Sequence, residues 1–197
     1  MRAFLNIYLF ADFLLWLVCI GMHKYFSNQI YDIGMDLELD KMPPLYDIFQ
    51  ESMPNLQSVR IIPEILHLIP IVILFGHIVY YRDHRSAFTL GAFLHKHGFL
   101  MVLRALFFSS TLLPDSSRMC KHTTLPGSCF DLIFSGHSTA ILLCTYLLRD
   151  HYNLSKFKFL LLQAINLITC IMIIACRNHY TIDVLVSIIV TNYVYDM

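Results

Sequence analysis

The sequence predicts an all-α, polytopic membrane protein, a six-helix transmembrane bundle in a single domain, 1–197. Of its 197 residues, 57% are hydrophobic and only 14% are charged, and the mean hydropathy of +0.60 exceeds that of ordinary soluble domains. A membrane-spanning helix needs roughly 17 to 25 predominantly apolar residues. Six apolar runs approach that length, and they cover residues 3–20, 61–81, 86–108, 130–148, 157–176 and 180–195.

The first run needs separate justification, because an apolar segment at the start of a chain can be a signal peptide. Residues 3–20 contain Asp12 and are not followed by a small-residue cleavage site, so we interpret them as a retained span. Asp12 and Lys96 both fall near the middle of their spans. We therefore expect them to neutralise each other between the first and third spans.

The loops between the runs predict the orientation. The short connections 82–85 and 149–158 are basic and belong in the cytoplasm, whereas the long, mostly acidic connection 23–60 and the connection 109–129 fall on the exoplasmic side. The fourth and sixth runs then begin on the exoplasmic side. Cys120 and Cys129 would lie there too, either as a disulfide or as two free thiols.

Two histidines and an aspartate stand where the fourth and sixth runs begin. His179 and Asp183 are four residues apart, a spacing that places two side chains on one helix face, so the carboxylate can orient and polarise the imidazole. His137 follows Ser135 and Gly136 at the other entrance. A nucleophilic histidine, its acid partner and a second histidine as proton donor suffice for phosphoryl transfer.

The segments Cys129–Ser138 and His179–Asp183 resemble the sphingomyelin synthase family, which includes inositol phosphorylceramide synthases and lies within the type 2 phosphatidic acid phosphatase superfamily. Weaker matches occur at Pro43–Asp47 and at Arg104–Pro114, and the resemblance covers most of the chain in order. It implies His179 as nucleophile, Asp183 as its acid and His137 as proton donor.

The same resemblance implies the substrates. Such an enzyme moves a phospho-head group (choline, ethanolamine or inositol) from a glycerophospholipid donor to a ceramide acceptor, releases diacylglycerol, and needs no cofactor and no metal. Ile173 stands where the wider superfamily has an arginine, six residues before His179, which argues against an ordinary phosphatase. An exoplasmic active site would suit the Golgi lumen or the plasma membrane.

Several residues are candidates for binding the anionic phosphate. Ser135 and the Gly136 amide can donate hydrogen bonds at a helix N-terminus. Arg104 either reaches the site or snorkels to the interface, and Arg177 either meets the phosphate or is a solvated loop cation. Asp131 either orients His137 or caps the span.

Other function classes find less support. Net charge is zero and no basic cluster is interleaved with aromatic residues, so a nucleic-acid partner has no electrostatic basis. Zinc at His137, His179 and Asp183 is disfavoured because the usual spacings of zinc ligands are missing. The alternatives to a transferase are a lipid phosphatase that uses the same residues with water, and a catalytically silent membrane relative.

Overall fold

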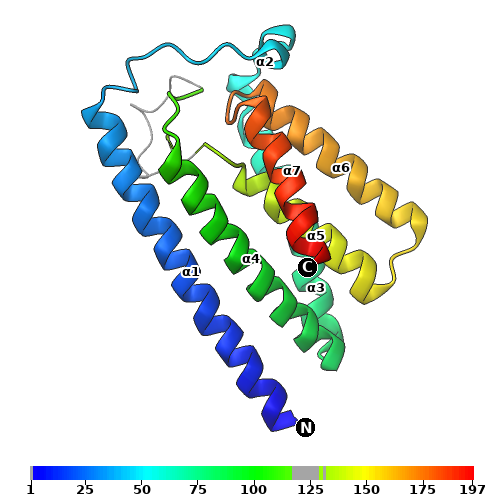
Figure 1. The fold of residues 1–197 in the computed structure, drawn as a ribbon. Coiled ribbons are helices and arrows are strands. Elements are labelled where there is room, and N and C mark those ends of the chain that lie inside the picture. The colour runs from blue at the N-terminus through cyan, green and yellow to red at the C-terminus, as the bar shows by residue number, and fades with distance from the viewer. Residues whose placement is uncertain (1, 117–128, 131) are drawn as a thin grey trace.

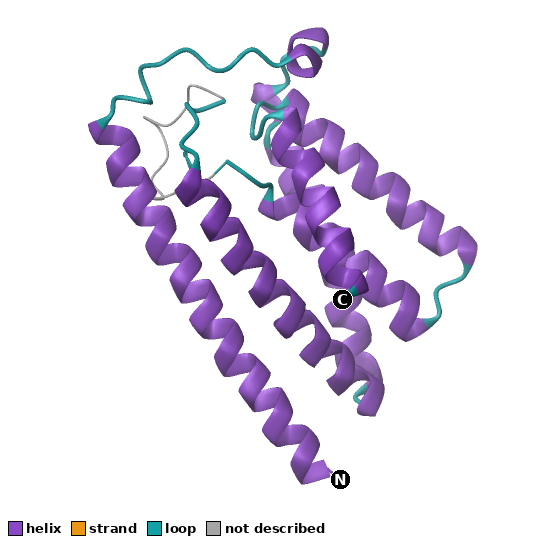
Figure 2. Cartoon of the chain, viewed as in Figure 1, coloured by secondary structure: helices purple, strands orange, loops and turns teal. Residues whose placement is uncertain are grey.

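The computed structural model describes residues 2–116, 129–130 and 132–197, and in this part of the chain it contains helices and loops without strands (Figure 2). The all-α class is therefore confirmed. Six long helices follow the predicted runs, and a five-residue helix α2 and a 3-10 turn η1 lie in the first connection. Their bounds are α1 Arg2–Asp36, α2 Ile48–Ser52, η1 Gln57–Val59, α3 Ile61–Tyr81, α4 His84–Ser110, α5 Gly136–Tyr152, α6 Lys156–Ala175 and α7 Thr181–Asp196.

Two boundaries differ from the predicted runs by more than four residues. Helix α1 continues sixteen residues past the predicted end at residue 20, because the more polar segment that follows contains no proline to interrupt it. Helix α5 starts at Gly136 rather than at 130, because Ser135 adopts extended backbone and its side chain accepts a hydrogen bond from the Ser138 amide. The cap of this helix is therefore Ser135. Asp131, the predicted cap, lies outside the described residues.

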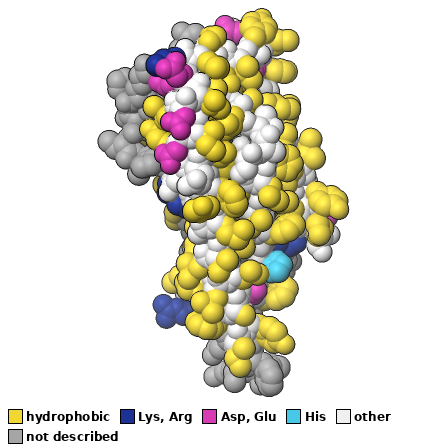
Figure 3. Space-filling model, turned by 60° about the vertical axis from the view of Figure 1, so that its left-hand side comes forward, with side chains coloured by type: hydrophobic (Ala, Val, Ile, Leu, Met, Phe, Trp, Pro, Cys, Tyr) yellow, Lys and Arg dark blue, Asp and Glu magenta, His cyan; other side chains and the backbone are white. Residues whose placement is uncertain are grey.

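Within the described residues, three helix segments are long and apolar enough to cross a membrane, namely Ile7–Asp36, Ile61–Tyr81 and Lys156–Ala175. Large hydrophobic side chains are exposed along them, and Figure 3 shows one face of the molecule dominated by such side chains, with acidic side chains gathered mainly toward one end. This surface fits an integral membrane protein. Helices α5 and α7 are shorter, at 17 and 16 residues, so the count of six spans stays a prediction.

Helix α5 lies at the centre of the bundle. It packs against α3, α4, α6 and α7, and its Ile141, Leu143, Cys144 and Leu148 are completely buried. Helix α1 packs mainly along α4, at the edge of the bundle (Figure 1). The chain runs back and forth, so α3, α5 and α7 all begin at the end of the bundle that carries α2 (Figure 1).

The cysteines fall into two groups. Cys19, Cys144, Cys170 and Cys176 are free and buried, as expected for small packing residues. Cys129 is disulfide-bonded. Its predicted partner, Cys120, lies outside the described residues.

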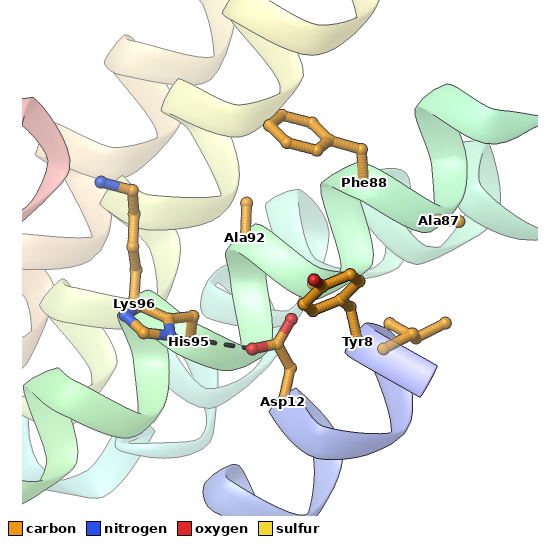
Figure 4. Close-up of a pocket in the computed structure, with 9 residues that line it drawn as sticks. Tyr8, Asp12, Ala87, Phe88, Ala92, His95 and Lys96 are labelled. Atoms are coloured by element: carbon orange, nitrogen blue, oxygen red, sulfur yellow. Dashed lines mark ion pairs between the residues drawn. The ribbon is translucent and has the colours of Figure 1, made fainter. Parts of the chain in front are cut away.

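The predicted pairing of Asp12 with Lys96 is wrong. Asp12 lies 3.8 Å from His95 Nδ1, while the Lys96 ammonium donates hydrogen bonds to the Val194 and Tyr195 carbonyls at 2.9 and 2.8 Å. Figure 4 shows the Lys96 ammonium directed away from the Asp12 carboxylate. Because neighbouring residues on a helix point in different directions, α1 meets His95, and Lys96 instead stabilises the carbonyls at the end of α7.

We expect Lys96→Met to destabilise the protein by about 1–3 kcal/mol, because two partly buried carbonyls lose a charged donor. Asp12→Asn should change stability by less than about 1 kcal/mol, because its partner His95 is 62% exposed. Thermal unfolding in detergent micelles measures both effects, with the exposed Lys158→Met as the matched control. Recovery of stability in a chain that carries Asp12→Lys with Lys96→Asp would contradict this assignment.

Candidate active site

His137, His179 and Asp183 lie together at the end of the bundle where α5 and α7 begin. The His179 and His137 ring centroids are 6.4 Å apart, and His179 Nδ1 is 3.2 Å from Asp183 Oδ2. His179 is 6% exposed and Asp183 is completely buried, whereas the His137 side chain is 31% exposed. The His137 side of this pair is therefore its open side.

The contact between His179 and Asp183 arises from a helix cap rather than from a helix face. Helix α7 begins at Thr181, so His179 precedes it, and Asp183 is its third residue. Asp183 Oδ2 accepts hydrogen bonds from the Tyr180 amide, at 3.0 Å, and from the His179 ring. A proton held on Nδ1 by this carboxylate leaves the lone pair on Nε2, which makes no hydrogen bond within the described part of the chain.

Backbone contacts fix this turn against its neighbours. The Ser135 amide donates to the Asp183 carbonyl at 3.2 Å, which ties the start of α5 to the first turn of α7. The buried Gln50 amide donates to the His179 carbonyl at 2.8 Å from α2. The hydrogen bond between the starts of α5 and α7 therefore fixes the positions of both histidines.

Helix α3 contributes two residues that the sequence analysis missed. Glu64 Oε2 lies 3.0 Å from His137 Nε2, and the edge of the His67 ring packs against His137 with centroids 4.8 Å apart. Glu64 stands inside the predicted second span, and an acidic residue in a span is itself a functional signal. The signal was overlooked because no motif surrounds Glu64. The site thus contains two imidazole–carboxylate pairs, His179 with Asp183 and His137 with Glu64.

Asp47 ties the connection between α1 and α3 to the start of α7. Its carboxylate accepts hydrogen bonds from the Thr181 amide and hydroxyl, at 2.6 and 2.9 Å, and also caps α2 through the Phe49 and Gln50 amides. Burial would raise the pKa of Asp47, but the bonds from Thr181, Gln50 and Phe49 outweigh it and hold the pKa below its ordinary value. Asp47 thereby links α2 to the start of α7.

Tyr180 joins a second pair of connections at the same place. Its hydroxyl donates to the Pro114 carbonyl at 3.0 Å and accepts from the Leu45 amide at 3.0 Å, and the residue is 2% exposed. The residue next to the predicted nucleophile therefore anchors both the chain before α2 and the chain after α4.

Arg104 is buried rather than snorkelling. It is 7% exposed, its Nε donates to the Phe134 carbonyl at 2.6 Å, and its Nη1 is 2.7 Å from His23 Nε2. Its guanidinium packs beside Gly136, where an added Cβ would lie 3.7 Å away. Arg104 thus supports the segment that enters α5 and places a positive charge near the site.

The other predicted phosphate ligands differ in burial and in whether their hydrogen-bond donors are free. Ser135 is completely buried and caps α5, so its role is structural. Gly136 is the first residue of α5 and its amide makes no hydrogen bond within the described residues. Arg177 is partly exposed, but its Nη1 is buried and has no hydrogen-bond partner among the described residues. Asp131 lies outside the described residues.

The helix directions favour an anion here. Helices α3, α5 and α7 present their N-termini to this end of the bundle (Figure 1), and unpaired amides and the helix dipole make each N-terminus partly positive. Together with the free Gly136 amide, this arrangement suits a phosphate group.

Comparison with known proteins agrees with this geometry. Residues 128–197, which include both histidines and Asp183, match the family described as PAP2 superfamily C-terminal. This match covers just over a third of the chain. The chain is also 24% identical over 180 residues to Sphingomyelin synthase-related protein 1 of Homo sapiens. The predicted resemblance is thereby confirmed.

The match with the human protein covers 78% of this chain and 43% of that protein. The chain thus spans less than half the length of the relative that it matches.

We expect Asp47→Asn to lower the melting temperature at pH 7, because the amide replaces a charged acceptor of four hydrogen bonds at the start of α7 and α2. A depressed folded-state pKa adds stability that is fully present above the unfolded pKa of about 3.9 and is lost as the pH falls through the folded value. The difference between wild type and variant should therefore shrink below about pH 4.

The matched control is Asp36→Asn, at an exposed residue at the end of α1. Melting curves in detergent from pH 7 to pH 3 provide the measurement. A gap between wild type and Asp47→Asn that stays constant over this range would show that the Asp47 charge does not stabilise the fold.

Proposed function

We propose that this protein is a sphingolipid synthase-like phosphotransferase, which moves a phospho-head group from a glycerophospholipid to ceramide through a phosphohistidine. One observation supports the proposal most directly: two imidazole–carboxylate pairs lie next to each other, and the His137 and His179 ring centroids are 6.4 Å apart. One pair is suited to attack on phosphorus and the other to proton transfer.

In the first half-reaction, His179 Nε2 attacks the phosphorus of the donor lipid. A nitrogen–phosphorus bond forms, the bond from phosphorus to the diacylglycerol oxygen breaks, and protonated His137 transfers a proton to that oxygen. Asp183 accepts the Nδ1 hydrogen bond and stabilises the positive charge that develops on His179. Diacylglycerol then leaves.

In the second half-reaction, His137 acts as the base. It removes the proton of the primary hydroxyl of ceramide, the hydroxyl oxygen attacks phosphorus, and the bond to His179 breaks. Glu64 holds His137 through Nε2, so the nitrogen that faces the substrate is Nδ1, which has no hydrogen-bond partner in the described structure. Glu64 also stabilises the protonated ring between the two steps.

The phosphate charge in this reaction requires hydrogen-bond donors and positive charge. We assign the Gly136 amide, at the N-terminus of α5, and the Arg177 guanidinium to the non-bridging oxygens. Arg104 adds positive charge from its buried position beside Gly136. The predicted orientation places the reaction on the lumenal or exoplasmic side of a Golgi or plasma membrane.

The deciding experiment expresses the chain in cells without sphingolipid synthase, supplies a labelled ceramide and identifies the product. A transferase yields a new phosphosphingolipid, whose head group shows which donor was used. A phosphatase instead releases free phosphate or phosphoalcohol and leaves the ceramide unchanged. Lipid turnover equal to that of cells without the chain would contradict both enzymatic functions.

We expect His179→Ala and His137→Ala to abolish transfer nearly completely, and Asp183→Ala to reduce it severely but less. Loss of the nucleophile removes the intermediate, loss of the proton carrier removes a factor of about 10²–10⁴, and loss of Asp183 misorients the nucleophile. Turnover of labelled ceramide is measured against His84→Ala, an exposed histidine at the start of α4. Transfer at the wild-type rate in any of the three would overturn the role given to that residue.

We expect Glu64→Gln to lower kcat about 10- to 100-fold with little change in KM, because the amide keeps the size of the side chain but loses the charge that holds His137. Glu64→Asp should recover part of the loss. The matched control is Glu51→Gln, an exposed glutamate in α2. A raised KM with unchanged kcat would assign Glu64 to substrate binding instead.

A further inference from the structure

A cluster of metal-ligand type lies where α3 meets α5. Glu64, His67 and His137 each offer one donor atom, and these atoms all lie within 4.8 Å of one another. The Glu64 carboxylate oxygen is 3.0 Å from His137 Nε2 and 3.9 Å from His67 Nδ1. The proposed transfer reaction uses Glu64 and His137 but gives His67 no task.

His67 Nδ1 is the informative atom. It is buried and makes no hydrogen bond of regular geometry among the described residues, although the Pro63 and Glu64 backbone carbonyls and the Glu64 carboxylate lie nearby. A buried polar atom without a partner is destabilising by about 1–3 kcal/mol. A ligand that accepts the lone pair of this nitrogen would remove that penalty.

The helices hold the three side chains in a suitable arrangement. Glu64 and His67 are three residues apart on α3 and so share a face. His137 is presented by α5, which packs directly against α3. Tetrahedral zinc bonded at about 2.0–2.2 Å keeps its donors roughly 3.4 Å apart, so a shift of about 1.5 Å by the His67 ring completes the set.

We propose that Glu64, His67 and His137 bind one zinc-type divalent ion, with a fourth position left open. Two imidazole nitrogens and one carboxylate suit Zn²⁺ and Co²⁺, whereas Mg²⁺ and Ca²⁺ prefer oxygen ligands. This set differs from the His137, His179 and Asp183 combination considered from the sequence, because Asp183 is completely buried and engaged with His179 and Tyr180.

The bound ion would inhibit, and this consequence rests on the proposed function. The ion takes the Nε2 lone pair of His137 in place of the hydrogen bond to Glu64. A proton then stays on Nδ1, and the ring has no lone pair left with which to accept the proton of the acceptor hydroxyl. Zinc would therefore inhibit transfer, because it competes with a proton for Nε2 of His137.

Metal binding is tested first, without reference to activity. The purified full chain, with any histidine tag removed, is titrated in detergent with Co²⁺ while the visible absorption of a tetrahedral site is followed, and Zn²⁺ is then added to displace it. We expect one ion per chain and no displacement by Mg²⁺. His67→Ala and the polar variant His67→Gln should each weaken binding at least tenfold, whereas His95→Ala, at an exposed histidine of α4, should not.

A chain that binds no Co²⁺, or binds it equally well after both His67 changes, would overturn the proposal. A melting curve of each variant tests whether it is folded, which separates loss of binding from loss of structure. If zinc inhibits transfer, the inhibitory concentration should rise at least tenfold in His67→Ala, measured relative to the zinc-free rate of that variant. Binding without inhibition would refute the inhibitory consequence alone, and binding in a chain without transferase activity would refute the proposed function alone.

Discussion

The site depends on the buried carboxylate of Asp183. An ionised carboxylate without exposure to solvent is very unfavourable unless hydrogen bonds compensate it, and the free amides at the N-terminus of a helix are the donors that a fold offers most readily. Asp183 meets the Tyr180 amide there and orients His179 with the same oxygen. The start of α7 thus determines where a polarised imidazole can stand, and the Ser135 amide bound to the Asp183 carbonyl brings α5 to the same point.

The connectivity explains why this point suits a phosphate. Successive long helices run in opposite directions, so α3, α5 and α7 begin at one end of the bundle (Figure 1). Each of them brings a partly positive N-terminus and one side chain of the candidate site in or next to its first turn, namely Glu64, His137 and Asp183. The carboxylates hold the imidazoles, and the free amide of Gly136 remains for an anion. Residues far apart in the sequence meet because each stands at a helix start.

The sequence predicted the helices better than the contacts between them. Apolar runs located six helices, but hydropathy does not detect a helix that continues into polar residues, so α1 was read too short. The His179 and Asp183 spacing predicted their contact, although through a helix face instead of a cap. The pairing of Asp12 with Lys96 failed, because depth in a span does not fix the direction of a side chain. Glu64 and His67 were missed because only packing of α3 on α5 brings them to His137.

The two imidazole–carboxylate pairs differ in burial, and the difference matches the tasks proposed for them. His179 and Asp183 are nearly or completely buried, which keeps water from a nucleophile that needs only one open nitrogen. The side chains of His137 and Glu64 are 31% and 41% exposed, and a proton carrier has to face both the leaving and the arriving hydroxyl. Water can reach the same face, so in the proposed reaction the choice between transfer and hydrolysis would depend on whether the acceptor lipid covers His137 while the head group is bound to His179. That dependence places acceptor specificity on the open side of the site, where α3 and α5 meet.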